Sequence, residues 1–215
     1  PRCAEISDRG HNLKSETSRG GSRNFVSPHH IPKLKNYWVN SKGGQAFSQP
    51  PSIIIAMFEE SPEHHEEIVL KGHRSFTQIT LQKHIEWQPF WQTLQNRFVE
   101  YIDKYMKDCN VTDKMFPQQY AFEQFRMKRY LPNDVDEFSD HVDVGNIDSA
   151  RRFLVFFLYL DHNRQGHTVF PQFDQAVVPE AGRLLMFPPM WTHLHAGKKP
   201  VEKPKYIIGS YLHYV

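Results

Sequence analysis

Two short stretches of the sequence hold histidines and a carboxylate at spacings that suit metal binding. The segment "DHVDVG" contains His141 and Asp143, and "WTHLHAG" contains His193 and His195. Side chains two positions apart leave the same face of a β-strand, so each pair is able to face one site. Two imidazoles and one carboxylate form the facial triad used by non-haem Fe(II) in oxygen chemistry. The same donors also suit zinc, so the triad alone leaves the metal open.

The chain contains thirteen histidines, and one His-x-Asp pair is therefore weak evidence by itself. Three further pairs have the same spacing: His64 with Glu66, His65 with Glu67, and His84 with Glu86. We expect these three pairs in or beside helices, where residues two positions apart do not share a face. Only His141 and Asp143 fall in a segment where strand geometry favours a common site.

A lysine follows the last of these histidines at a suggestive distance. Lys205 lies ten residues after His195 and opens the run "KYIIGSYLHY". If "KKPVEKP" is a turn, this strand returns beside the histidine strand. A lysine that faces a barrel interior needs an anionic partner, because an unpaired buried charge is costly, and a dicarboxylate cosubstrate would supply one. The alternative is that Lys205 points outward, as most lysines do.

Short β-rich runs dominate the chain after Pro117, separated by "PND", "DHNRQG", "PEAG" and "KKPVEKP". Many short strands at close spacing predict a sandwich or a barrel-like double sheet. Before them, an apolar stripe at helical spacing predicts a helix over 87–110, with Pro89 near its first turn and Asn110 at its end. The run 50–58 resembles a strand, and "SPEHHEEIVL" resembles the start of a helix. We therefore expect a mainly β jelly-roll barrel, supported by helices from residues 60–110.

The length of 215 residues suits one domain, which we place at 51–215, with a strand and supporting helices over 51–115 and the β core over 116–215. Residues 1–35 carry seven Lys and Arg against three Asp and Glu, and we expect 1–50 to be a basic, flexible extension. A net charge of +2 gives little support for nucleic-acid binding. The longest apolar run, 153–160, is too short to span a bilayer. Two cysteines and no visible signal peptide favour a cytoplasmic protein.

The motifs over 116–215 resemble, in order, those of the Fe(II)/2-oxoglutarate-dependent dioxygenases of prolyl 4-hydroxylase type. The matching segments are "FRMKRYLPND", "DHVD", "RRFLVFFLYLD" with "QGHTVFP", "VVPEAGRLLMFPP", "WTHLHAG" and the pair Lys205-Tyr206. The compact enzymes of phages and bacteria are the most similar. The resemblance implies a double-stranded β-helix, with Fe(II), 2-oxoglutarate and O2 as reactants and ascorbate as a supporting reductant.

The resemblance also implies roles for individual residues. His141, Asp143 and His195 would bind iron. Lys205 would pair with the distal carboxylate of 2-oxoglutarate, Tyr130 would hydrogen-bond the same end, and Thr168 would support the cosubstrate. We place three further side chains around the pocket, as walls or as supports of the ligands: His193, Trp191 and Arg152.

The chain departs from the family pattern at two places. The loop before His141 lacks the usual glycines and is acidic, with four carboxylates at Asp134, Asp136, Glu137 and Asp140. An acidic rim would favour a cationic substrate, whereas a solvated loop would have no such role. Gly166 stands alone where a pair of glycines is common. Both departures lie at expected pocket edges and therefore concern the substrate more than the cofactor.

The resemblance implies hydroxylation of an unactivated C–H bond, with a prolyl residue of a peptide or protein as the first substrate. A free amino acid or another small molecule stays open as the substrate. Two other reactions use the same triad. A zinc hydrolase would not need Lys205, and a nucleic-acid demethylase of a related fold usually holds 2-oxoglutarate with arginine. The basic first segment is the only feature that favours the demethylase.

Overall fold

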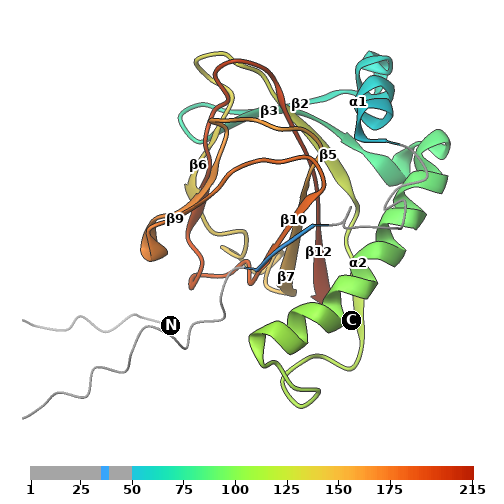
Figure 1. The fold of residues 1–215 in the computed structure, drawn as a ribbon, viewed down its shortest axis with the longest axis vertical. Coiled ribbons are helices and arrows are strands. Elements are labelled where there is room, and N and C mark those ends of the chain that lie inside the picture. Colours follow the sequence, from blue (N-terminus) through green and yellow to red (C-terminus); the bar gives the residue numbers. More distant parts are fainter. Residues whose placement is uncertain (1–34, 39–49) are drawn as a thin grey trace, which may run out of the picture. The chain divides into compact units, whose positions relative to one another are not determined.

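The computed structural model describes residues 35–38 and 50–215 (Figure 1). The helices are α1 (Pro51–Glu59) and α2 (Gln88–Cys109), with short 3-10 turns between strands. The strands are β1 (Lys35–Trp38), β2 (Glu66–Leu70), β3 (Arg74–Thr80), β4 (Tyr120–Phe122), β5 (Arg126–Tyr130), β6 (Phe138–His141), β7 (Arg152–Tyr159), β8 (Thr168–Phe170), β9 (Gln175–Val177), β10 (Arg183–Phe187), β11 (His195–Gly197) and β12 (Lys205–Tyr214). The extension expected over 1–50 lies outside the described residues except for β1, which pairs with β10.

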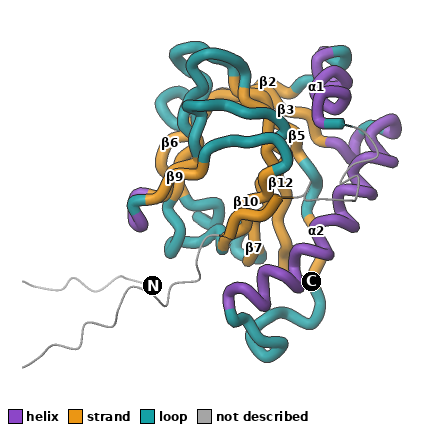
Figure 2. Tube along the Cα trace, viewed as in Figure 1, coloured by secondary structure: helices purple, strands orange, loops and turns teal. Residues whose placement is uncertain are grey.

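All strand pairs are antiparallel, and they follow the order β1-β10-β7-β12-β5-β3-β6-β11-β8-β9. Strands that are far apart in the sequence become neighbours, because β12 lies between β7 and β5 while β11 lies between β6 and β8. The sheet curls so that these two groups of strands face each other, with α2 beside the sheet (Figure 2). The predicted fold class is confirmed: the chain forms a mainly antiparallel β half-barrel of the double-stranded β-helix type, with a long helix before it.

The central strands divide their side chains between two apolar cores. In β7, Leu154, Phe156 and Leu158 belong to the core that includes the buried face of α2. The alternate residues of the same strand belong to a second core inside the half-barrel: Val155, Phe157 and Tyr159. Successive side chains of a strand point to opposite faces, so one buried strand serves both cores. The continuous apolar run of β7 follows from burial on both faces.

Helix α2 forms where the sequence predicted it. Proline stands in its first turn, and Asn110 ends it in the left-handed conformation with φ 54°. The side chain of Phe98 is fully buried, and its ring stacks on Phe156 of β7 with centroids 4.8 Å apart. The apolar stripe therefore packs against the outer face of the sheet, as expected. No helix in the described part of the chain is long and apolar enough to cross a membrane.

Two of the predicted elements before α2 were wrong. Residues 51–59 form α1 and not a strand, because Ile54 and Phe58 are four positions apart and are both buried on one helical face. The segment after Pro62 forms one 3-10 turn and then β2, although its first residues resemble a helix start. Pairing of β2 with β3 decides this conformation, and such pairing has no local sequence signal.

We expect Phe98→Ala to lower the free energy of unfolding by about 3–5 kcal/mol, because it removes a fully buried ring from the contact between α2 and β7. Chemical denaturation measures this loss. The neighbouring Val99 is 43% exposed, and Val99→Ala should cost less than about 1 kcal/mol. Equal effects of the two variants would contradict this packing arrangement.

Candidate metal centre and cosubstrate cavity

Three ligand-type side chains meet at the open end of β6 and β11. His141 and His195 are direct partners across these two antiparallel strands, so both imidazoles leave the same face. Their ring centroids are 4.2 Å apart. The Asp143 carboxylate lies 3.5 Å from Nε2 of His141 through Oδ1 and 3.5 Å from Nε2 of His195 through Oδ2. The two nitrogens and the carboxylate therefore converge on one point.

The spacing of His141 and Asp143 predicted that both lie on one strand. Asp143 instead lies in a loop, because β6 ends at His141. The backbone N–H groups of Asp143 and Val144 both donate to the carbonyl of Pro189, at 3.0 and 3.1 Å. The hydroxyl of Tyr211, on β12, donates to Oδ1 of Asp143 at 3.0 Å. These hydrogen bonds fix the carboxylate although no strand holds it.

Main-chain carbonyls set the orientation of both histidine rings. Nδ1 of His141 lies 2.7 Å from the carbonyl of Ser139, and Nδ1 of His195 lies 3.0 Å from the carbonyl of His193. A carbonyl only accepts, so each Nδ1 carries the proton and donates. The lone pair of each ring is then on Nε2, which is the nitrogen that faces Asp143. A carbonyl behind the ring is the usual support of a metal-bound histidine.

The site leaves buried polar atoms without a protein partner. Oδ2 of Asp143 and Nε2 of His195 are both buried and make no hydrogen bond. Such atoms are costly unless something binds them, and a cation between them would satisfy both. Burial lowers the pKa of His195 to about 4, so this imidazole is neutral and able to bind a metal at pH 7. Burial raises the pKa of Asp143, but the nearby His195 and His141 outweigh it and hold the pKa at about 2.

A narrow cavity leads from the three ligands into the half-barrel, and Lys205 lies in it. The Lys205 side chain is buried, and its Nζ donates to the carbonyls of Gly166 at 3.0 Å and Lys198 at 2.8 Å. No ion pair within the described part of the chain includes Lys205. Burial, followed by the charge of Lys128, lowers the pKa of Lys205 to about 7. An anionic ligand in the cavity would supply the missing counter-charge.

Tyr130 and Thr168 line the same cavity as Lys205. The ring of Tyr130 lies 4.3 Å from Nζ of Lys205, and the two residues are partners across β5 and β12. Thr168 accepts a hydrogen bond from the hydroxyl of Tyr159 at 2.7 Å. Tyr159 was missed by the sequence analysis, although strand alternation in "RRFLVFFLYL" places it on the inner face.

Gly166 is required where it stands because the lysine passes directly beside it. A Cβ atom at position 166 would lie 2.8 Å from Cδ of Lys205. The single glycine noted in the sequence therefore makes room for the Lys205 side chain.

Lys128 is a second lysine beside the site that the sequence analysis did not single out. It shares the inner face of β5 with Tyr130, two positions later, and this spacing is the signal that could have revealed it. It lines the cavity that holds Lys205 and also a larger cavity that His141 and Asp143 border. Burial lowers the pKa of Lys128 to about 8, against the opposing effect of Asp143.

The three residues expected around the pocket have different places. His193 is fully buried, its ring packs near Phe173 and Phe187, and only its carbonyl supports His195. The strand β11 begins at His195, so the two histidines do not share a strand face. The prediction for Trp191 was wrong, because this side chain is 76% exposed and lines neither cavity at the site.

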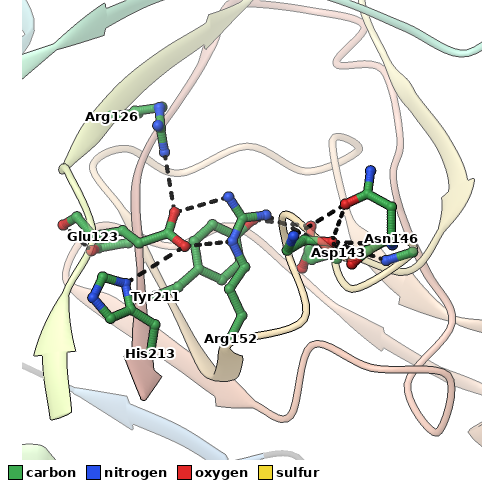
Figure 3. A network of polar contacts seen from close by, with 10 residues as sticks. Glu123, Arg126, Asp143, Asn146, Arg152, Tyr211 and His213 are labelled. Carbon is green, nitrogen blue, oxygen red and sulfur yellow. Dashed lines mark hydrogen bonds and ion pairs between the residues drawn. The ribbon is translucent and has the colours of Figure 1, made fainter. Parts of the chain in front are cut away.

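Arg152 lies beside the site and belongs to a network around Glu123 (Figure 3). Its Nε and Nη2 donate to the two carboxylate oxygens of Glu123 at 2.7 and 2.8 Å, and its Nη1 donates to the carbonyl of Asp143 at 3.3 Å. Arg126 and His213 also approach Glu123, at 3.8 and 3.9 Å. Arg152 thus ties the ligand loop to β4 and its neighbours.

The acidic loop before His141 does not form an acidic wall. Asp136 is buried, where it accepts hydrogen bonds from the hydroxyl of Ser75 at 2.7 Å and from the backbone of Leu131 at 2.8 Å. Asp134 lies 3.9 Å from Lys199. Neither of the two cavities beside the three ligands is lined by this loop's carboxylates.

A second group of possible metal ligands lies within the described residues, formed by His64, His84 and Glu86. The rings of His64 and His84 stack at 3.8 Å, and Nδ1 of His64 lies 3.1 Å from Glu86. His64 and Glu86 lie in short 3-10 helices and His84 directly before one, as expected of residues in or beside helices, but the two segments meet in space, which their spacing did not reveal. Stacked rings cannot both direct a nitrogen at one ion without rotating, and Glu86 is exposed. The group at His141 is therefore the better metal site.

The comparisons with known proteins agree with this geometry. Residues 125–213 match the sequence profile described as the 2OG-Fe(II) oxygenase superfamily. No curated protein matches the chain. Among solved structures, a prolyl hydroxylase from Trichoplax adhaerens, in complex with a hypoxia inducible factor peptide fragment, is similar with a TM-score of 0.63 and 13% identity over 85% of this chain and 84% of that one.

Two further solved structures are similar in fold. One is a viral collagen prolyl hydroxylase from Paramecium Bursaria Chlorella virus-1 in its 2-oxoglutarate complex, with a TM-score of 0.53 and 17% identity over 77% of this chain and 90% of that one. The other is a prolyl-4-hydroxylase from Pseudomonas putida, with a TM-score of 0.53 and 14% identity over 85% and 92%. Residues 125–213, which carry the half-barrel strands of the His-Asp-His group, therefore belong by their sequence match to the 2OG-Fe(II) oxygenase superfamily.

Proposed function

We propose that the protein hydroxylates a prolyl residue in a peptide or protein. One molecule each of 2-oxoglutarate, O2 and substrate would give succinate, CO2 and the hydroxylated product. The observation that carries this proposal is that three metal-ligand side chains and a buried lysine without a carboxylate partner line one cavity. This combination suits a cation at the three ligands and an anionic group at the lysine, which fits Fe(II) and 2-oxoglutarate, the two cofactors typical of the superfamily.

In this proposal, His141, Asp143 and His195 hold Fe(II) through two Nε2 atoms and one carboxylate oxygen. The bound iron supplies the activation of O2 and the oxidising power for C–H cleavage. The chain contributes two imidazoles, whose rings the carbonyls of Ser139 and His193 orient. It also contributes an ionised carboxylate that Tyr211 holds in place.

Lys205 binds the distal carboxylate of 2-oxoglutarate in this proposal, and Tyr130 and Thr168 border the same end of the cavity. The apolar side chains of Phe157 and Ile207 line the rest of it and exclude water. Exclusion of water strengthens the charge pairing of the lysine with its ligand.

The peptide substrate is supported by two of the similar structures, which are named as a collagen prolyl hydroxylase and as a prolyl hydroxylase with a bound peptide fragment. Free amino acids and other small molecules remain alternative substrates of the same chemistry. The zinc hydrolase has less support, because it gives no role to the buried Lys205. The demethylase depended on the basic first segment, most of which lies outside the described residues.

We expect His195→Ala to weaken Co(II) or Mn(II) binding at least about 100-fold, since even the loss of a residue behind a metal ligand costs 10- to 100-fold. Anaerobic calorimetric titration measures this, and succinate formation from 2-oxoglutarate should disappear in parallel. His162→Ala removes an exposed histidine away from the site and serves as the matched control. Unchanged metal affinity in His195→Ala would refute the assignment.

The zinc alternative gives the opposite response to metal exchange. Zinc added to the Fe(II)-loaded protein should inhibit succinate formation, because zinc takes the same ligands and has no redox chemistry. Hydrolytic activity that zinc restores and that does not require 2-oxoglutarate would favour the hydrolase.

We expect Lys205→Met to raise the dissociation constant of 2-oxoglutarate by about 30-fold or more, because truncating a buried charge partner costs about 2–5 kcal/mol. Binding is measured anaerobically with Mn(II). Lys203→Met, which removes an exposed lysine paired with Asp161, should leave the constant unchanged. Equal 2-oxoglutarate affinity in wild type and Lys205→Met would remove the lysine from the binding site.

The same lysine predicts a pH dependence of cosubstrate binding. The pKa of Lys205 is about 7 in the free protein, and a bound carboxylate would raise it. Binding then takes up a proton above pH 7, so 2-oxoglutarate should bind more weakly as the pH rises from 7 to 9. Lys205→Met should lose this slope. A flat profile in wild type would contradict the pairing.

Gly166→Ala should weaken 2-oxoglutarate binding without loss of metal affinity, because its Cβ would displace the Lys205 side chain. Gly145→Ala is the matched control, since a Cβ there meets no atom within 4 Å. The two titrations, with Mn(II) and with 2-oxoglutarate, separate the effects. Unchanged cosubstrate affinity in Gly166→Ala would show that Lys205 can move without consequence.

A further inference from the structure

A cavity of about 340 Å³ lies beside the three ligands and outside the cosubstrate cavity. His141 and Asp143 line it, so a molecule bound there would lie next to the metal position. Its other lining residues come mainly from β3, β5, β7 and β12, which are neighbours in the sheet. This is the place from which a substrate would reach the reacting centre.

Basic side chains dominate the walls of this cavity. Asp143 is the only carboxylate among its lining residues. Four of them carry a positive charge: Arg74, Arg126, Lys128 and Arg152. Glu123 approaches two of them, Arg126 and Arg152, and offsets one charge (Figure 3). In the sum of charges over both cavities, the single negative charge of Asp143 offsets the single positive charge of Lys205, although the two side chains form no ion pair. The two charges of a divalent metal cancel those of 2-oxoglutarate, so about three positive charges stay unmatched.

Arg74 and Lys128 are the two cations that have no carboxylate partner among the described residues. The guanidinium of Arg74 lies 5.6 Å from the ring centre of Phe138, and the ammonium of Lys128 lies 4.8 Å from the ring centre of Phe76. Aromatic faces hold these cations in place but do not neutralise them. The two residues stand on β3 and β5, which pair with each other, and both point into the cavity.

The chemistry of the walls fits a carboxylate on a short apolar stem. The Arg74 fork matches the two oxygens of a carboxylate, and the partly buried Lys128 adds a second positive charge. The rings of Phe76 and Phe138 and the side chain of Ile68 offer apolar surface for methylene groups. An extended nucleic-acid backbone would instead require cations spread along a surface, whereas these line one cavity.

We propose that the peptide substrate presents an aspartyl or glutamyl side chain, close to the oxidised residue, to Arg74 and Lys128. This proposal rests on the proposed function, because it assumes that the substrate is a peptide. It reverses the expectation of a cationic substrate that the acidic loop raised, since the loop carboxylates do not line this cavity.

Binding of three matched prolyl peptides tests the proposal without any catalytic turnover. The peptides differ only in one neighbour of proline, which is Glu, Gln or Lys, and each binds to full-length protein with Mn(II) and 2-oxoglutarate under anaerobic conditions. We expect the Glu peptide to bind at least tenfold more tightly than the Gln peptide and the Lys peptide to bind most weakly. Added salt should narrow these differences.

Variants assign the preference to the two cations. Arg74→Gln and Lys128→Met, each saturated with Mn(II) and 2-oxoglutarate, should reduce the Glu-over-Gln ratio to below about threefold. Arg97→Gln removes an arginine on α2, away from the cavity, and should retain the full ratio. A ratio that persists in both cavity variants would overturn the proposal, as would equal binding of the Glu and Gln peptides.

A pair of small molecules separates this proposal from the proposed function. N-acetylglutamate and N-acetylglutamine are titrated in the same way. If N-acetylglutamate binds tighter in an Arg74-dependent manner and no peptide binds, the carboxylate site is supported and the peptide substrate is refuted. If neither acidic probe exceeds its amide, the carboxylate site is refuted, whether or not the protein turns over 2-oxoglutarate.

Discussion

The alternation of side chains along buried β-strands is the constraint on which the rest of the structure depends. In β12, the residues at 205, 207, 209 and 211 face the interior of the half-barrel, and those between them face the helices. The outer set packs with α2 and provides the apolar burial that drives folding. The inner set then places Lys205 and Tyr211 at the two ends of one site, on a strand that cannot shift by one residue without exposing its core face.

The site buries charged groups, which costs free energy, and the protein supplies only some of the partners that these groups need. Asp143 has one oxygen bound by Tyr211 and one without a partner, and Lys205 has carbonyl acceptors but no carboxylate. Arg126, Arg152 and His213, by contrast, all lie within 4 Å of one protein carboxylate, that of Glu123. Arg152 thus has a carboxylate partner within the protein, whereas under the proposed function Asp143 and Lys205 would find theirs in bound ligands.

Much of the catalytic half was predictable from the sequence, because its signals are local. The runs around β7, β10 and β12 carry apolar patterns that indicate buried strands, and Pro89 and Asn110 mark the two ends of α2. The pairing of His141 with Asp143 followed from their spacing, whereas the choice of His195 over His193 followed from the resemblance to the dioxygenase family. The prediction that His141 and Asp143 share one strand face was only half correct, since Asp143 lies in a loop.

The parts that could not be predicted depend on contacts between distant segments. Residues 51–59 form a helix where a strand was predicted, because they are buried against α2. Residues 66–70 form a strand where a helix was predicted, because they pair with β3. Lys128 acquires its place only when β5 joins β3 and β12. Asp136 becomes a buried acceptor for Ser75, which lies 61 positions earlier, so its charge cannot be read from the composition of its loop.

The pairing of β6 with β11 also has a consequence for how the chain holds together. His141 and His195 are 54 positions apart in the sequence, and β6 and β11 form a short ladder between them. A metal ion held by both residues would close this loop as a disulfide does. By the chain-entropy argument, a cross-link over such a length disfavours the unfolded chain by on the order of 4 kcal/mol. The catalytic ion would thus act as a reversible cross-link, so the free energy of unfolding would depend on the concentration of metal.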